Sequence, residues 1–195
     1  QFRVKDESHG WRWMSAQCLA DESGSMQMLL VDITDQVETK RQQQEAAHVH
    51  RVVATVIETL ASAEQVEETA TEVLAILGEE LQLTRLSWFE IAPRSREATL
   101  LAAWSAEGSD QPLAFDPRPG IAHQPGLLDR GLPLLGTSDH PQALFLPILL
   151  HGRLASVLTF ETNARDRWTS ATLTEVSRIG DAFGRRIEQE ETADE

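Results

Sequence analysis

One stretch, QMLLVDITDQVETKRQQQEAA at residues 27–47, constrains the fold more than any other part of this 195-residue chain. Its first part is an apolar run typical of a β-strand, and from Asp35 onward the sequence becomes charged and rich in glutamine. No glycine or proline occurs between Gly24 and Gly78, so nothing in this stretch favours a turn. The sequence therefore predicts a strand that leads directly into a long polar helix over residues 35–61.

Composition narrows the classes of protein to which the chain can belong. Its 31 acidic and 17 basic residues give a net charge of −14, which opposes binding to nucleic acid or to anionic lipid. The longest apolar runs fall far short of the roughly 20 residues that cross a bilayer, so we expect no membrane insertion. Cys18 is the sole cysteine, which excludes an intrachain disulfide and a thiolate metal cluster and fits a cytoplasmic protein.

The first 34 residues have the pattern of a three-stranded antiparallel meander. The segments FRVK, WRWMSAQCLA and MQMLLVDIT read as strands, and DESHG and DESGS supply the turn residues between them. So few residues bury little apolar surface by themselves. This piece therefore looks like the end of a larger sensor sheet.

The helix expected over residues 35–61 carries one thin apolar stripe. Val49, Val53, Val56 and Leu60 follow one another at steps of four, three and four, which is typical of a heptad seam. A helix that is polar on its other faces usually needs a partner, so we expect these four residues to pair two copies of the chain. The alternative is an amphipathic helix that lies on its own domain.

The remainder of the chain predicts a mixed α/β (α+β) unit. Ser62 and Gln65 resemble a capping box that starts a second helix, in which Gly78 should weaken the last turn. Strands are expected over residues 83–92 and 98–108, followed by a Pro- and Gly-rich loop over 109–142 with short pieces around Ile121 and Leu132–Leu135. A hairpin, ALFLPILL and RLASVLTFET around His151-Gly152, comes next. Thr169 or Ser170 should cap a final helix.

This order of elements resembles a GAF domain over roughly residues 45–190. The residues that carry the resemblance are VEETATEVLAILGEELQLTRLSWFEI, LFLPILLHGRLASVLTFET and RDRWTSATLTEVSRIGDAFGRRI, with Trp168 leading the last helix. The resemblance implies an antiparallel sheet flanked by helices, and it is more specific for fold than for activity.

The first residues are similar to the C-terminal strands of a PAS domain. The matching pieces are Gly10-Trp11-Arg12-Trp13, Gly24 and the junction Asp32-Ile33-Thr34. The resemblance implies that the other PAS elements precede residue 1 and that the junction passes the state of a sensor sheet to the helix. The expected organisation is a PAS remnant over 1–34, a signalling helix over 35–61, a GAF domain over 62–190 and an acidic tail over 191–195.

Together the two resemblances imply a non-enzymatic module of a bacterial signalling protein. P-loop, protein-kinase and diguanylate cyclase signatures are absent from the sequence, so such an output would lie downstream. The resemblance implies a homodimer formed by the linker and C-terminal helices, with a histidine kinase, a diguanylate cyclase of cyclic-di-GMP signalling or a transcription activator as output. A receptor for a small ligand or haem is the alternative, and an enzyme on a GAF scaffold is a third reading.

Aromatic residues of the expected sheet and loop are candidates for a ligand pocket, although ordinary core packing would also explain them. The candidates are Trp88, Trp104, Phe115, His123 and Phe145. His123 or His140 could bind haem or a metal, but no second ligand pattern supports either histidine. No cysteine follows Cys18, so we expect no covalent bilin, no catalytic thiolate of a sulfoxide reductase and no resident cofactor.

Overall fold

A computed structural model describes residues 1–6, 10–20, 26–106, 125–136, 142–164 and 167–193. The chain divides into two compact units, Gln1–Ala47 and His48–Glu195. The division falls inside a single helix, α1 (Thr34–Ser62), which supplies residues to both units. The expected strand-to-helix transition is therefore present.

The first unit is the antiparallel meander that the sequence predicts. Strands β1 (Phe2–Asp6), β2 (Gly10–Ala20) and β3 (Met26–Asp32) pair in the order β1-β2-β3. In their register Arg3 lies opposite Trp13, and Ser15 lies opposite Val31. The Arg3 guanidinium lies 5.3 Å from the ring centre of Trp11 and 5.4 Å from that of Trp13.

The second helix begins later than the capping-box pattern predicts. Ser62 is the last residue of α1, and its hydroxyl donates to the carbonyl oxygens of Glu58 and Thr59. Helix α2 (Val66–Glu80) follows Gln65, whose side chain makes no capping hydrogen bond. The predicted capping box is therefore wrong, because a serine hydroxyl can bond back to its own helix as readily as it can cap the next one.

The second unit is built on a five-stranded antiparallel sheet in the order β5-β4-β8-β7-β6. Its strands are β4 (Arg85–Ile91), β5 (Ala98–Ser105), β6 (Leu134–Leu135), β7 (Ala143–Leu150) and β8 (Arg153–Glu161). Along the chain, the short helix α4 (Pro125–Leu128) lies between β5 and β6, and α5 (Ser170–Ala193) follows β8. The mixed α+β class and the hairpin at His151-Gly152 are confirmed. Ile121, in the expected loop, lies outside the described residues.

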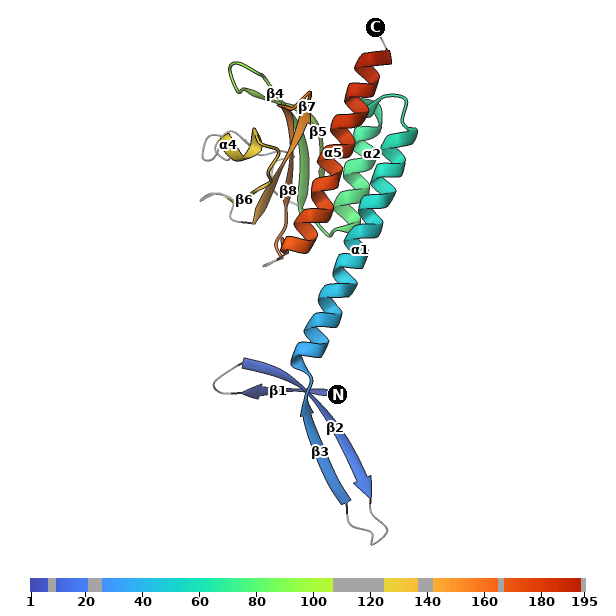
Figure 1. The fold of residues 1–195 in the computed structure, drawn as a ribbon, viewed down its shortest axis with the longest axis vertical. Coiled ribbons are helices and arrows are strands. Elements are labelled where there is room, and N and C mark those ends of the chain that lie inside the picture. Colours follow the sequence, from blue (N-terminus) through green and yellow to red (C-terminus); the bar gives the residue numbers. More distant parts are fainter. Residues whose placement is uncertain (7–9, 21–25, 107–124, 137–141, 165–166, 194–195) are drawn as a thin grey trace. The chain divides into compact units, whose positions relative to one another are not determined.

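Helices α2 and α5 pack on one face of this sheet, the second half of α1 contributes to their core, and α4 lies on the other face (Figure 1). Strand residues alternate between the two cores, as the pleat requires. Leu86, Leu146 and Phe160 face the helices, whereas Phe89 and Val157 belong to the core on the α4 face. We call these two sides the helix face and the α4 face.

Two glycines let the helices approach the sheet closely. A Cβ atom on Gly78 would lie 2.1 Å from the Trp104 ring, and one on Gly180 would lie 2.6 Å from the carbonyl oxygen of Pro147. Because Gly78 has no side chain, the Trp104 ring of β5 can pack directly against α2. Helix α5 starts as predicted, because the Thr169 hydroxyl accepts from the backbone N–H of Thr172 at 3.2 Å.

Candidate functional site

The predicted pocket residues do not converge on one cavity. Trp88 lies in the core of the helix face, with its ring 5.3 Å from that of Phe183 in an edge-to-face contact, and Trp104 packs against the same core. Phe145 belongs to the core of the α4 face. The described members of the predicted pocket are therefore separated by the sheet, and Phe115 and His123 lie outside the described residues.

The predicted dimer seam is occupied by the chain's own core. Val49, Val53, Val56 and Leu60 are each at most 2% exposed and pack with residues of α2, α5 and the sheet. Their assignment to an intermolecular seam is therefore wrong. A helix that lies on its own domain needs the same i, i+3, i+4 stripe as a coiled coil, so the spacing could not distinguish the two.

The junction Asp32-Ile33-Thr34 is held by hydrogen bonds to β2. Asp32 accepts from the N–H of Thr34 at 3.0 Å and from its hydroxyl at 2.7 Å. The hydroxyl oxygen of Thr34 accepts a hydrogen bond from the backbone N–H of Trp13 at 2.9 Å, and the backbone N–H of Ile33 donates to the Trp13 carbonyl oxygen at 2.8 Å. Strand pairing thus passes without interruption into the first turn of α1.

Arg12 completes this network from the neighbouring strand. Its guanidinium lies 2.8 Å from the second carboxylate oxygen of Asp32. The hydrogen bonds from Thr34, assisted by Arg12, lower the pKa of Asp32 to about 2. The carboxylate therefore stays ionised near the helix N-terminus, where negative charge is favourable.

A buried ion pair lies on the α4 face of the second unit. Arg85 and Glu161 face each other across β4 and β8, with an N–O distance of 2.5 Å, and are 3% and 8% exposed. The buried hydroxyl residues Ser87 and Thr159 occupy the next row of the same face. These charges and hydroxyls form a polar stripe on an otherwise apolar sheet face.

A second polar feature ties α5 to the connection between α1 and α2. Arg186 donates to the carbonyl oxygens of Ala63 at 2.5 Å and Glu64 at 2.9 Å, just after α1 ends. Glu190 accepts from the N–H of Val66 at 2.9 Å, which is the first residue of α2, and lies 3.4 Å from Arg186. The positively charged Arg186 thus meets carbonyl groups at the C-terminal end of α1, and the negatively charged Glu190 meets an N–H group at the N-terminal end of α2. We call Arg186 and Glu190 the α5 clamp.

A cavity of about 480 Å³ lies beside this clamp on the helix face. Its floor includes Trp88 and Ile187, and its rim carries five glutamates and one arginine: Glu64, Glu67, Glu90, Glu190, Glu191 and Arg186. No predicted pocket residue other than Trp88 lines it among those described. Sequence reasoning missed the cavity because its walls come from α2, β4, β8 and α5, whose proximity is a property of the fold.

The described histidines contact protein groups near the surface. His48 lies 2.8 Å from the Glu80 carbonyl, His50 lies 2.9 Å from Glu175, and His151 lies 3.2 Å from Glu191. The hydrogen bond from His50, assisted by Arg178, lowers the pKa of Glu175. The described residues contain no group of three metal-ligating side chains, and His123 and His140 lie outside them.

Comparison with known proteins places this architecture. No protein-family model and no curated protein match the sequence. Among solved structures, a free methionine-R-sulfoxide reductase from Neisseria meningitidis is similar, with a TM-score of 0.62, 16% identity, and 76% of this chain and 93% of that one covered. A phycocyanobilin-bound GAF domain from a cyanobacterial phytochrome is also similar, with a TM-score of 0.61 and 14% identity, and the match covers 74% of this chain and 96% of that one.

A third similar structure is the GAF domain of a phosphoenolpyruvate-protein phosphotransferase from Coxiella burnetii. It has a TM-score of 0.59 and 15% identity, and covers 76% of this chain and 97% of that one. The chain has a GAF fold. The covered share is about the length of the second unit, which we therefore call the GAF unit.

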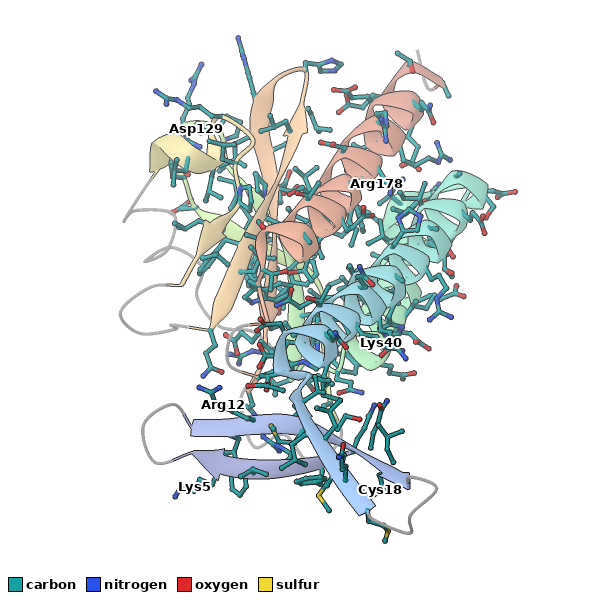
Figure 2. All side chains as sticks on the ribbon, turned by 60° about the horizontal axis from the view of Figure 1, so that its bottom comes forward. Lys5, Arg12, Cys18, Lys40, Asp129 and Arg178 are labelled. Atoms are coloured by element: carbon teal, nitrogen blue, oxygen red, sulfur yellow. The ribbon has the colours of Figure 1, made fainter. Side chains whose placement is uncertain are left out.

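Two further observations bear on how the GAF unit could work. Cys18 is exposed on β2 of the first unit (Figure 2), and the GAF unit itself contains no cysteine. In the described part of the chain, no helix is long and apolar enough to cross a membrane.

Proposed function

We propose that this chain is a non-enzymatic sensory or regulatory module that passes the state of one unit to the other through α1. The observation that carries the proposal is the course of that helix. Its first turn is held to β2 and β3 by the Asp32–Thr34 network, and its second half supplies Val49 to Leu60 to the core of the GAF unit. A displacement of either end is therefore transmitted along a hydrogen-bonded helix.

In this proposal the first unit is the end of a PAS domain, and an output domain follows Glu195. The α5 clamp supports a mechanical connection between α1 and the last helix, because it bonds the last helix to both ends of the α1–α2 connection. The output would be a histidine kinase, a diguanylate cyclase or a transcription activator. Such outputs commonly act as pairs, and we propose that the outer faces of α1 and α5, in place of the buried valine stripe, form the homodimer.

A fusion of the chain to a diguanylate cyclase domain at Glu195 tests transmission. Gln43→Pro breaks α1 in its polar half, because proline removes a backbone donor and clashes with the preceding turn. We expect the cyclase rate to change at least about threefold, with the melting temperature of the GAF unit preserved. Gln43→Ala is the matched control and should leave the rate unchanged; equal rates for all three proteins would contradict transmission through α1.

A small-ligand receptor is the second candidate, and the Arg85–Glu161 pair favours it. Charged groups are rarely buried without a reason, and this pair adjoins two buried hydroxyl residues on a sheet face. Native mass spectrometry of the protein purified from cells would detect a tight ligand, and a visible absorption scan would detect haem. A haem bound through His123 predicts a Soret band that His123→Ala removes; the apo mass alone and a flat spectrum would contradict this candidate.

An enzyme on this scaffold is the weakest candidate. One similar structure is a methionine sulfoxide reductase, but the GAF unit has no cysteine to act as the thiolate that this chemistry needs. We therefore propose a regulatory role rather than catalysis. Measurable turnover of free methionine sulfoxide with a thiol reductant would contradict this part of the proposal.

A further inference from the structure

The cavity beside the α5 clamp has the dimensions and composition of a small-molecule site. Its volume of about 480 Å³ lies within the range of roughly 300–1,000 Å³ that such sites occupy. It lies within the GAF unit, on the helix face of the sheet, so it does not involve the Arg85–Glu161 pair on the opposite face. Its lining includes residues of α2, α5 and strands β4, β5, β7 and β8.

The floor of the cavity combines apolar surface with a buried donor. Leu150 and Ile187 line it, together with Trp88, whose side chain is 98% withdrawn from solvent. The indole Nε1 of Trp88 is itself withdrawn from solvent and has no hydrogen-bond partner among the residues that the structure describes, so an occupant reaches this donor only after the side chains around it shift. A buried N–H without an acceptor is unfavourable, so the floor calls for an acceptor atom from elsewhere.

The rim of the cavity selects the charge of its occupant. Glu64, Glu67 and Glu90 form no ion pair with any residue of the described ranges, although all three line the cavity. The Nη2 atom of Arg186, the one basic residue in the lining, already binds two backbone carbonyls. The electrostatic potential of the rim is therefore negative, which attracts a cation and repels an anion.

We propose that this cavity binds a small organic ammonium compound that also carries a hydrogen-bond acceptor. The ammonium group lies among Glu64, Glu67 and Glu90, and the carbon skeleton packs on Leu150 and Ile187. The acceptor, such as an amide or hydroxyl oxygen, receives the hydrogen bond of the Trp88 indole. Because the clamp residue Glu190 lines the same cavity and caps α2, the compound is also placed to affect the packing of α5.

The proposal predicts how four matched probes rank. 6-Aminohexanamide carries both the ammonium and the acceptor, hexylamine lacks the acceptor, hexanamide lacks the charge, and adipamic acid replaces the ammonium with a carboxylate. Nitrogen–proton NMR of the ¹⁵N-labelled full chain reports on its five tryptophan indoles, and loss of one signal in Trp88→Phe assigns Trp88. We expect saturable movement of that signal with 6-aminohexanamide, weaker binding of the two partial probes and none of adipamic acid.

Substitutions at the rim of the cavity test the proposal without altering the hydrophobic core, which Trp88→Phe does alter. Glu67→Gln and Glu90→Gln remove charge from side chains that lie at the surface, so both variants should fold. Each substitution should lower the affinity for 6-aminohexanamide about two- to fivefold, which is the range expected for exposed ion pairs, and added salt should lower the affinity further. Glu72→Gln, on α2 but outside the cavity, is the matched control. Equal affinity for adipamic acid, no saturable shift, or an unchanged affinity for 6-aminohexanamide when Glu67→Gln and Glu90→Gln are combined would overturn the proposal.

Discussion

The two sheets of this protein are made of similar residues but differ in what covers them. The central strands of the GAF unit are covered on both faces, by helices and by the segment that contains α4, and carry residues such as Leu158 and Phe145 with no exposed surface. The sheet of the first unit leaves apolar side chains exposed, with Met28 at 67% and Trp11 at 57%. Strand propensity alone therefore does not make a core; a covering layer does.

This difference predicts where substitutions unfold the protein. In the GAF unit each polar group on the sheet must be satisfied from within the fold, because the cover excludes water. In the first unit exposed groups keep access to water, so the loss of a partner costs little. The following predictions test that contrast, beginning with the largest expected effect.

Removing one half of the buried ion pair should be the most damaging change. Glu161→Ala leaves the Arg85 charge in the covered sheet, and we expect a loss of about 3–5 kcal/mol in the free energy of unfolding of the GAF unit. Urea unfolding followed by tryptophan fluorescence measures it. Arg12→Ala removes a half-exposed ion pair of the first unit and is the comparison; a similar loss in both variants would contradict the contrast.

Filling the space at Gly78 should produce the next largest effect. Gly78→Ala places a methyl group against the Trp104 ring, and forced overpacking typically costs about 1–3 kcal/mol even though alanine favours helix. The melting temperature of the GAF unit should fall accordingly. Gly126→Ala in α4, where an added Cβ meets nothing within 4 Å, is the control and should be close to neutral.

Replacing exposed apolar residues of the first unit should change association more than stability. Threonine keeps strand propensity, so Met28→Thr with Leu30→Thr should leave the free energy of unfolding within about 0.5 kcal/mol. The two substitutions reduce the exposed apolar area that favours association, so light scattering should show less self-association. The same exchange at the buried Leu158 should unfold a large fraction of the GAF unit; equal tolerance at both places would remove the distinction between the sheets.

The smallest expected effect is a pH dependence at the start of α1. The pKa of Asp32 is lowered in the folded state to about 2 from an ordinary value near 3.8, so ionised Asp32 stabilises the junction above that ordinary value. The contribution is lost as the pH falls from about 4 to about 2. The protection factors from amide hydrogen exchange at residues 34–38, which are corrected for the intrinsic pH dependence of exchange, should fall over that range in the wild type and be low throughout in Asp32→Asn, with Asp35→Asn as control.

Much of the fold could be predicted because local patterns encode it. The continuous apolar run at residues 143–150 and the His151-Gly152 pair, which adopts positive φ angles of 50° and 74°, specify the hairpin. The candidate site was harder to predict, because Trp88 and Phe145 alternate with polar or smaller neighbours in similar ways but face opposite sides of the sheet. Charged Arg85 and Glu161 inside apolar strands were the signal that could have identified the buried pair.

The sequence by itself determined the order of strands and helices and the unbroken passage from β3 into α1, since these depend on residues close together along the chain. Only the tertiary structure decided that Val49, Val53, Val56 and Leu60 pack inward, that Glu190 caps α2 and that glutamates from α2, β4 and α5 surround one cavity. The physical reason is that an apolar stripe or a carboxylate specifies its need for a partner, whereas the partner itself is supplied by residues distant in sequence that the packed sheet brings together.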